Sequence, residues 1–341
     1  MPVTIKDIAR SAGVSHTTVS RALRDHPALA PATIDRIKTL ADTMGYIPSA
    51  AARGLKTHRS NTLGVILSSI DDPYYSEILQ GIEDELRGTG ISLFVAATHR
   101  DPEIERSIVR LLGEQRVEGV IVGSTQFNTS HHRMLQQVGV PVAVINNQAA
   151  ELYRYSIYHD DEYGSRTVTE HLIGLGHRQI GFLGNQFSGK TNDDRVLGYM
   201  HAMQSAGMDV APEWIHLEAN GTPEAGAEGA KYFLALHNLP TAIVCFNDMM
   251  AIGCLHQIQQ SGLNVPRDIS ITGFDNIQFS EYTNPPLTTF DQPKREIGAA
   301  AARMLLDLLH CPEVESNSQP KIIMLQGHLL TRGTTAPRKN T

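Results

Sequence analysis

The sequence contains few cysteines, few aromatic residues and no long apolar run. It has three cysteines and one tryptophan in 341 residues. Such a chain does not carry the dense disulfide framework of a small secreted domain. We expect Cys245 and Cys254, which lie in apolar stretches, to be buried free thiols. Because no apolar run approaches the roughly 20 residues that span a bilayer, we expect no membrane partner.

Residues arranged for catalysis or metal binding are also missing. No His/Cys grouping has the spacing of a metal site. His159, Asp160 and Asp161 form a polar cluster, but no nucleophile with a base is evident near it. Met1 is followed at once by polar helical sequence, so a signal peptide is not expected. We therefore expect no cofactor, no enzymatic activity and a cytoplasmic location.

The charge of the chain is divided unevenly between its two ends. Residues 1–60 contain nine Lys/Arg against four Asp/Glu, a net charge of +5. The remainder contains 20 against 32, a net charge of −12. A small basic head on an acidic body indicates that only the head meets phosphate, although a chance fluctuation in a short segment would produce the same imbalance. A chain of this length is sufficient for two or three domains.

A stretch near the N-terminus, IKDIARSAGVSHTTVSRALR, predicts two short helices with a tight turn between them. Ile5, Ile8 and Ala9 place apolar side chains on one face at helical spacing. Gly13 can end the first helix because glycine tolerates the left-handed conformation. Ser15 can cap the second helix by accepting a backbone N–H. The pattern is typical of a helix–turn–helix.

The outer face of the second helix carries short polar residues and an arginine, namely His16, Thr17, Ser20 and Arg21. These residue types suit the major groove of DNA. An ordinary helical hairpin with a solvated face is the alternative. A third helix is expected from Pro31 to Gly45.

From residue 61 on, buried strands alternate with amphipathic helices. Such alternation predicts parallel sheets covered by helices on both faces. Two successive α/β units predict a two-lobed protein whose ligand binds in the cleft between the lobes. We expect the strands at residues 62–68, 91–97, 119–123 and 142–146, and then at 179–184, 214–217, 242–246 and 270–274.

The sequence resembles the lactose-repressor (LacI/GalR) family. The resemblance rests on VTIKDIARSAGVSHTTVSRAL, on GYIPSAAARGLK and on the long region after them, which is similar to periplasmic binding proteins. It covers the chain from Val3 to about Arg332. It implies a helix–turn–helix head, a hinge helix and a two-lobed effector-binding and dimerisation core. The expected bounds are 1–46 for the head, 47–60 for the hinge, 61–341 for the core, about 61–159 and 291–320 for lobe 1, and about 160–290 and 321–332 for lobe 2.

The resemblance implies a homodimer on a pseudo-palindromic, double-stranded DNA operator. His16, Thr17 and Arg21 are expected to read base edges. The hinge helices are expected to pack in the minor groove, where Leu55 wedges a base step and the small Ala52 permits close approach; a plain linker is the alternative. The residues expected to position the head on phosphates are Thr4, Ser15, Thr18 and Ser20.

The resemblance also implies a small-molecule effector in the cleft, and we expect a sugar or sugar derivative that relieves repression. A corepressor acting in the opposite sense is equally compatible with the sequence. Any one of the matched residues also suits a cap or a loop, but as a set they lie at strand ends. The expected effector residues are Ser69, Tyr74, Tyr75, Asn146, Thr191, Arg195, Asn247 and Asp275.

One matched position departs from the family pattern. Relatives that bind a purine or a galactoside carry a large aromatic residue near the position of Gly221. The departure puts stacking on that side in doubt and would permit a bulkier ligand.

The C-terminal region is expected to return to the first lobe through a helix over 295–309, as the family's crossings imply. Residues 322–325 and 327–331 are predicted to form a closing hairpin. The tail 333–341 is predicted to be disordered. No heptad of leucines follows, so a dimer is expected.

Residues 184–191, GNQFSGKT, match the phosphate-binding pattern G-x-x-x-x-G-K-[ST] and follow an expected strand. A P-loop nucleotide-hydrolysing protein is therefore one alternative. Asp193 and Asp194 oppose it because they put carboxylates near the phosphates. Lys190 can still add positive charge at the cleft mouth, which would favour an acidic or phosphorylated effector. A sugar-binding module without a DNA role is the other alternative, and the basic head argues against it.

Overall fold

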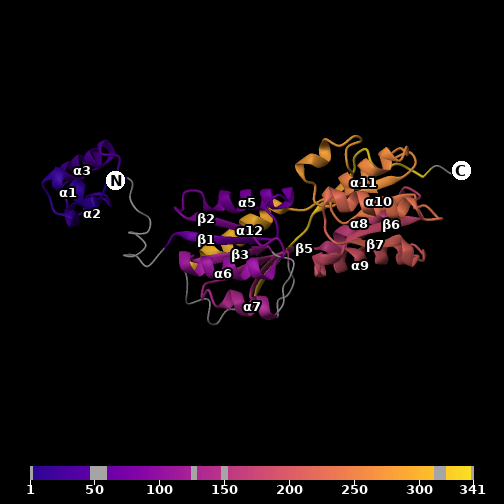
Figure 1. The fold of residues 1–341 in the computed structure, drawn as a ribbon, viewed down its shortest axis with the longest axis horizontal. Coiled ribbons are helices and arrows are strands. Elements are labelled where there is room, and N and C mark those ends of the chain that lie inside the picture. The colour runs from indigo at the N-terminus through magenta and orange to yellow at the C-terminus, as the bar shows by residue number, and fades with distance from the viewer. Residues whose placement is uncertain (1–2, 47–59, 124–128, 147–152, 311–319, 339–341) are drawn as a thin grey trace. The chain divides into compact units, whose positions relative to one another are not determined.

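The structure is a computed structural model that describes residues 3–46, 60–123, 129–146, 153–310 and 320–338. It divides into two compact units, Met1–Ser60 and Asn61–Thr341, and each is considered by itself (Figure 1). Ala52 and Leu55, the hinge residues expected to enter the minor groove, lie outside the described residues.

The first unit contains three helices around a small apolar core. These are α1 (Ile5–Ala12), α2 (His16–Ala22) and α3 (Pro31–Thr43). Ile8, Val19 and Ile37, one from each helix, are fully buried against one another. Gly13 ends α1 with a φ of 67°, and Ser15 caps α2 by accepting a hydrogen bond from the backbone N–H of Thr18 at 3.1 Å. The predicted three-helix head is confirmed.

The second unit begins with a lobe built on a six-stranded parallel sheet, which we call the first lobe. Its strand order is β11-β5-β4-β3-β1-β2. Helices α5 and α12 cover one face, and α6 and α7 cover the other. The elements of this lobe are β1 (Thr62–Leu67), α5 (Pro73–Leu86), β2 (Ser92–Ala97), α6 (Pro102–Gln115), β3 (Gly119–Gly123), α7 (Thr129–Gln136), β4 (Val142–Ile145), β5 (Tyr155–His159), α12 (Lys294–His310) and β11 (Lys321–Leu325).

The second lobe repeats this architecture on a four-stranded parallel sheet of order β7-β6-β8-β9. Helices α10 and α11 cover one face, and α8 and α9 cover the other. Short turns of 3₁₀-helix occur at η1 (Gln186–Ser188), η2 (Pro212–Trp214) and η3 (Gln278–Glu281). The main elements are α8 (Asp161–Gly174), β6 (Ile180–Asn185), α9 (Lys190–Ser205), β7 (Ile215–Glu218), α10 (Pro223–Leu234), β8 (Ala242–Cys245), α11 (Asp248–Gln260) and β9 (Ser270–Thr272).

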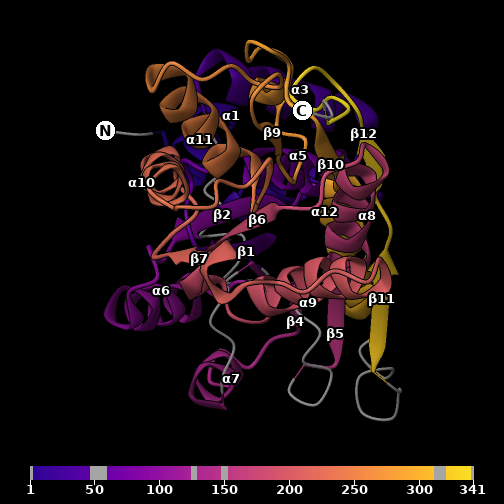
Figure 2. The ribbon, with the colours of Figure 1, turned by 90° about the vertical axis from the view of Figure 1, so that its right-hand side faces the viewer.

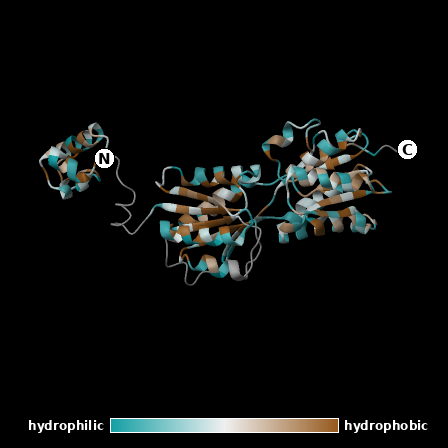
Figure 3. Ribbon diagram, viewed as in Figure 1, coloured by the Kyte–Doolittle hydropathy of each residue, from teal (hydrophilic) through white to brown (hydrophobic). Residues whose placement is uncertain are grey.

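Hydropathy follows this layering. The sheet strands carry most of the strongly apolar residues, whereas the helices alternate between apolar and polar positions (Figure 3). Cys245 and Cys254 are buried free thiols, as expected. Among the described residues, no helix combines the length and apolar character needed to cross a membrane.

The C-terminal region departs from the sequence expectation. The predicted closing hairpin over 322–331 is wrong. β11 pairs in parallel with β5 of the first lobe, and the two strands lie side by side (Figure 2). β12 (His328–Leu330) pairs instead with β10 (Thr289–Asp291) in a separate antiparallel pair. The assignment of 321–325 to the second lobe is corrected accordingly, and β5 itself was not expected as a strand.

The tail is also ordered where disorder was expected. Thr334 is fully buried, and its backbone carbonyl accepts a hydrogen bond from the Ile271 N–H at 2.9 Å. Farther along, the Arg338 N–H donates to the Leu175 carbonyl at 2.8 Å. A polar tail is held here because its backbone groups complete the edge of the second sheet. The helix α12 does return to the first lobe, where it packs on α5.

Candidate functional site

A cavity of about 550 Å³ lies between the two lobes of the second unit, at the carboxyl ends of their strands. Loops after β1, β2 and β4 line it from the first lobe, and loops after β6, β7, β8 and β9 line it from the second. The structure brings together every residue that was expected to contact an effector. These are Ser69, Tyr74, Tyr75, Asn146, Thr191, Arg195, Asn247 and Asp275.

Arg195 is the main cation of the cavity and is only 4% exposed. Its Nε donates to Asp161 Oδ1 at 2.8 Å, and its Nη1 donates to the Phe246 carbonyl at 2.5 Å. The guanidinium lies over the rings of Phe246 and Phe274, at 4.5 and 3.9 Å from their centroids. These protein contacts therefore fix the orientation of the guanidinium plane without a ligand.

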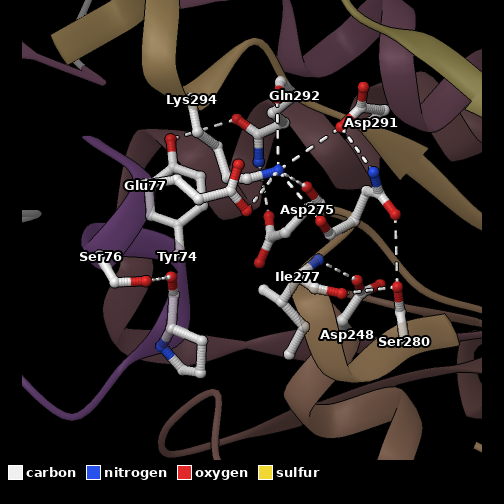
Figure 4. Close-up of polar contacts among 12 residues, drawn as sticks. Tyr74, Ser76, Glu77, Asp248, Asp275, Ile277, Ser280, Asp291, Gln292 and Lys294 are labelled. Carbon is white, nitrogen blue, oxygen red and sulfur yellow. Dashed lines mark hydrogen bonds and ion pairs between the residues drawn. The ribbon is translucent and has the colours of Figure 1, made fainter. Parts of the chain in front are cut away.

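Asp275 follows β9 and lies deep in the cavity wall (Figure 4). Its carboxylate accepts a hydrogen bond from Gln292 Nε2 at 2.6 Å and lies 3.9 Å from Arg195 Nη1. Burial raises the pKa of Asp275 well above its usual value, while Arg195 opposes that rise. A carboxyl group in this position can accept a hydrogen bond from a ligand hydroxyl or, when protonated, donate one.

Asp161, at the start of α8, behaves differently from Asp275. Burial by itself would raise its pKa, but Arg195 and His159 outweigh burial, so the pKa lies below its usual value. His159 is 1% exposed, and its Nδ1 lies 3.8 Å from Asp161 Oδ1. Asp161 therefore remains ionised and neutralises Arg195 inside the wall.

The two tyrosines at the start of α5 take different directions. The Tyr74 hydroxyl donates to Asn146 Oδ1 at 3.0 Å. It also contacts Gln292 Oε1 at 3.3 Å (Figure 4). Tyr75 turns into the first lobe, where its hydroxyl donates to the Gly123 carbonyl at 2.9 Å. Burial raises the pKa of Tyr75 to about 12. Tyr74 is thus the tyrosine whose hydroxyl belongs to the polar network of the cavity.

Asn247 both caps a helix and lines the cavity. Its Oδ1 caps α11 by accepting the Met250 N–H at 2.9 Å, and its Nδ2 donates to the Gly221 carbonyl at 3.1 Å. A Cβ atom on Gly221 would lie 2.8 Å from Asn247 Nδ2 and 3.2 Å from Asn185 Nδ2. A side chain at position 221 would therefore displace these amides.

The cavity lining also contains polar residues that were not predicted as contacts, among them Asp161, Asn185, Gln292 and Glu224. Asn185 ends β6, so the rule that ligands meet strand ends would have found it. Gln292 lies on the segment that returns to the first lobe, and its place depends on that crossing. Asp161 was seen as part of a polar cluster, but its partner Arg195 lies 34 residues away in the chain.

Polar groups in and beside the segment that matches a phosphate-binding loop form hydrogen bonds and an ion pair with other groups of the protein. The Asn185 N–H donates to Asn192 Oδ1 at 2.9 Å, and Lys190 Nζ binds Asp194 Oδ1 at 2.7 Å. Asp248 lies after the apolar strand β8 and would be the magnesium ligand of such a nucleotide site, but it accepts hydrogen bonds from the Ile277 N–H and the Thr289 hydroxyl. Helix α9 begins at Lys190, inside the matched segment. These contacts give no support to nucleotide hydrolysis.

The helix–turn–helix head presents its expected DNA-reading residues to solvent. His16, Thr17 and Arg21 are exposed on α2. The residues expected to contact phosphate take part in local hydrogen bonds. The Thr4 hydroxyl donates to Asp7 at 2.6 Å, and the Ser20 hydroxyl accepts from Arg24 at 2.8 Å. Arg24, which was not predicted as a contact, thus lies beside Ser20, just after the end of α2.

Comparisons with known proteins match both units. The family described as bacterial regulatory proteins, lacI family, matches residues 4–49, and the periplasmic binding protein-like domain matches residues 169–335. The HTH-type transcriptional repressor PurR of Vibrio campbellii is 35% identical over 325 residues, which cover 94% of this chain and 97% of that protein.

Solved structures agree with the fold. The lac repressor dimer bound to operator and the anti-inducer ONPF has a TM-score of 0.87 and 28% identity, covering 98% of this chain and all of that one. The complex of the transcriptional regulator CelR with cellobiose has a TM-score of 0.74 and 25% identity, covering 97% of this chain and 99% of the other.

Proposed function

The chain belongs to the LacI family of DNA-binding transcriptional repressors, and we propose that it binds a pseudo-palindromic operator as a homodimer under the control of a sugar-like effector. The observation that carries the effector role is the shared cavity. Residues far apart in sequence, from both lobes, meet there with hydrogen-bonding groups that suit hydroxyls. A relative of known structure holds cellobiose, which is consistent with this ligand class.

The lobes offer different groups to one ligand. Tyr74 and Asn146 belong to the first lobe, whereas Arg195, Asn247 and Asp275 belong to the second. A ligand that contacts both sets stabilises one angle between the lobes over others. Its effect on DNA affinity equals its differential affinity for the two conformations.

The experiment is a thermal-shift screen of the full chain followed by operator binding. The panel contains sugars, sugar acids, phosphosugars, purines, nucleosides and ATP with magnesium. A ligand at 100 times its dissociation constant adds roughly 2.7 kcal/mol of stability. We expect a sugar to shift the melting temperature and to lower the affinity for operator; a ligand that raises this affinity would make the protein a corepressor-dependent repressor.

Asn247→Ala and Arg110→Ala are the matched variants for this screen. Asn247 lines the cavity, whereas Arg110 lies exposed on α6 and forms only a surface ion pair with Glu114. Asn247→Ala is expected to abolish the ligand shift and Arg110→Ala to leave it intact. A sugar shift that survives in Asn247→Ala would place the effector outside the cavity.

A further inference from the structure

We propose that the cavity selects an uncharged polyhydroxylated effector and rejects its phosphorylated or carboxylated derivatives. This inference rests on the proposed effector role of the cavity and adds the charge class of the ligand. It reverses the suggestion, drawn from the position of Lys190 in the sequence, that the cleft mouth favours an acidic ligand.

The lining of the cavity contains more carboxylates than cations. Its acidic residues outnumber its arginines even when Asp275 is counted as protonated. The deep pair, Asp161 with Arg195, neutralises itself at 2.8 Å. The remaining negative charge lies toward the exposed rim, at Asp71 and Glu224. The charged residues that line the cavity are Asp71, Asp72, Asp161, Glu224, Asp275, Arg100 and Arg195.

Three cations near the cavity, Arg195, Lys190 and Lys294, already bind oxygen atoms of the protein. Burial raises the pKa of Asp72, and Arg100, the other arginine of the lining, opposes that rise, so a neighbouring carboxyl offsets the Arg100 charge. Arg195 gives its Nε and Nη1 to Asp161 and to a carbonyl, so only Nη2 lacks a protein acceptor among the described residues. Lys190 does not line the cavity and binds Asp194 at 2.7 Å. A phosphate needs several donors, and one terminal nitrogen does not supply them.

Lys294, the third cation, is 2% exposed and lies behind Asp275 (Figure 4). Its ammonium donates to the backbone carbonyls of Asp275, Asn276 and Gln292. It also lies 3.5 Å from carboxylate oxygens of Glu77 and Asp291. Its three donors are therefore used inside the wall, and it offers none to a ligand.

Helix N-termini, which bind anions in many proteins, are capped by this chain's own oxygens. Asp72 Oδ1 accepts the Tyr74 N–H of α5 at 3.0 Å. Thr222 caps α10 at 3.4 Å, and Asn247 caps α11 at 2.9 Å. The start of α9 has no side-chain cap, but Asp193 places a carboxylate in its first turn. An anion would have to displace these oxygens or lie beside them.

The other polar groups of the cavity lining are mostly neutral. Amides of Asn146, Asn185, Asn247 and Gln292 line the cavity together with the Tyr74 hydroxyl. Amides and hydroxyls both donate and accept, as sugar hydroxyls do. A neutral polyol can exchange its hydrogen bonds with water for bonds to these groups without an unpaired charge.

The test compares matched ligand pairs on the full chain by calorimetry at constant ionic strength. The pairs are glucose with glucose 6-phosphate, galactose with galacturonate, and ribose with ribose 5-phosphate. Inorganic phosphate is titrated separately, because it probes the cavity whatever the effector is. We expect each anion to bind at least about tenfold more weakly than its neutral parent, and phosphate to give no saturable heat.

The double variant D71N/E224Q removes rim charge without changing side-chain size. We expect the ratio of the dissociation constant of each anion to that of its neutral parent to fall by several-fold in this variant, whatever the change in affinity for the neutral sugar. The proposal would be overturned if any anion bound more tightly than its neutral parent sugar. So would millimolar or tighter phosphate binding that Arg195→Met abolishes. If no sugar of the panel alters operator affinity but phosphate is still rejected, the effector role fails and the charge selection stands.

Discussion

Arg195 shows how one side chain can be both structural and available for recognition. Its guanidinium is held between two phenylalanine rings and a carboxylate, yet one nitrogen still lacks a protein partner among the described residues. Such a residue tolerates no shorter cation, because its donors are fixed in a plane. The same reasoning applies to the exposed residues of α2, whose donors are free to meet base edges.

At the residue scale, Arg21→Ala is expected to relax the base preference of the head. An arginine that reads a guanine contributes about 1–3 kcal/mol of discrimination against the wrong base. Selection of operators from a random library would measure the change. Arg10→Ala is the control, since Arg10 is equally exposed but lies on α1 beside Asp7. If the two variants select the same operator as the wild type, Arg21 does not read bases.

Asp248→Asn is expected to change how the stability of the core depends on pH. Burial raises the pKa of Asp248 to about 6, so the folded state keeps a proton that the unfolded state has lost. Stability from this group is therefore present below about pH 4 and is lost as the pH rises through 6. The loss is on the order of 3 kcal/mol.

The substitution keeps the geometry, because an amide oxygen can accept the Ile277 N–H while the amide nitrogen donates to the Thr289 hydroxyl. Melting temperatures at pH 5 and 7 measure the effect. The drop between these values should be smaller in the variant than in the wild type. An equal drop in both proteins would show that Asp248 is ionised in the folded state at pH 5.

At the element scale, glycines allow helices α5 and α12 to approach closely on one face of the first sheet. A Cβ on Gly81 would lie 2.0 Å from the Arg295 carbonyl oxygen, and one on Gly298 would lie 2.0 Å from the Ile78 carbonyl oxygen. The same pair of helices carries ion pairs from Arg295 to Asp84 and from Arg303 to Glu85. Close packing of backbones, rather than these exposed charges, sets the helix separation.

Gly81→Ala is expected to destabilise the core by about 1–3 kcal/mol, because a backbone atom cannot move aside cheaply. Gly113→Ala is the matched control in α6, where a Cβ would meet no atom within 4 Å. That change should stabilise the core by about 0.4–1 kcal/mol. Chemical denaturation followed by circular dichroism compares them. A neutral Gly81→Ala would mean that α5 and α12 can separate without cost.

At the scale of the whole molecule, charge and coupling are the relevant quantities. The basic head meets phosphate, and the acidic core, which carries the cavity, does not favour anions. A protein of this kind responds to its effector only if the effector binds one of two conformations more tightly and these conformations differ in their affinity for DNA. That condition links the affinity for operator to the affinity for effector, two quantities that are usually measured separately.

The factor by which an effector changes operator affinity should equal the factor by which operator changes effector affinity. Fluorescence anisotropy with labelled operator gives the first, and calorimetry of the protein–operator complex gives the second. Sedimentation of the complex is expected to show two chains on one operator. Unequal factors at matched salt would show that the effector also acts through a second site or through assembly.

Much of this protein was accessible from sequence patterns. Helical periodicity and the residues Gly13 and Ser15 placed the helix–turn–helix, and the alternation of strands with helices placed both parallel sheets. Asn146 and Asp275 each follow a strand of a different sheet, and the resemblance to the LacI/GalR family placed both at one cleft before their contacts were known. These features depend on local periods, on the rule that ligands meet strand ends and on the family resemblance.

Tertiary structure alone decided the remainder. β11 is a short strand that could pair with several edges, and burial against α12 and β5 places it in the first sheet. Likewise, Asp161 meets Arg195, and Lys294 loses its donors to three carbonyls, only after distant segments come together. The partner of a buried polar group depends on desolvation and geometry in the folded chain. Neither of these can be deduced from the local sequence.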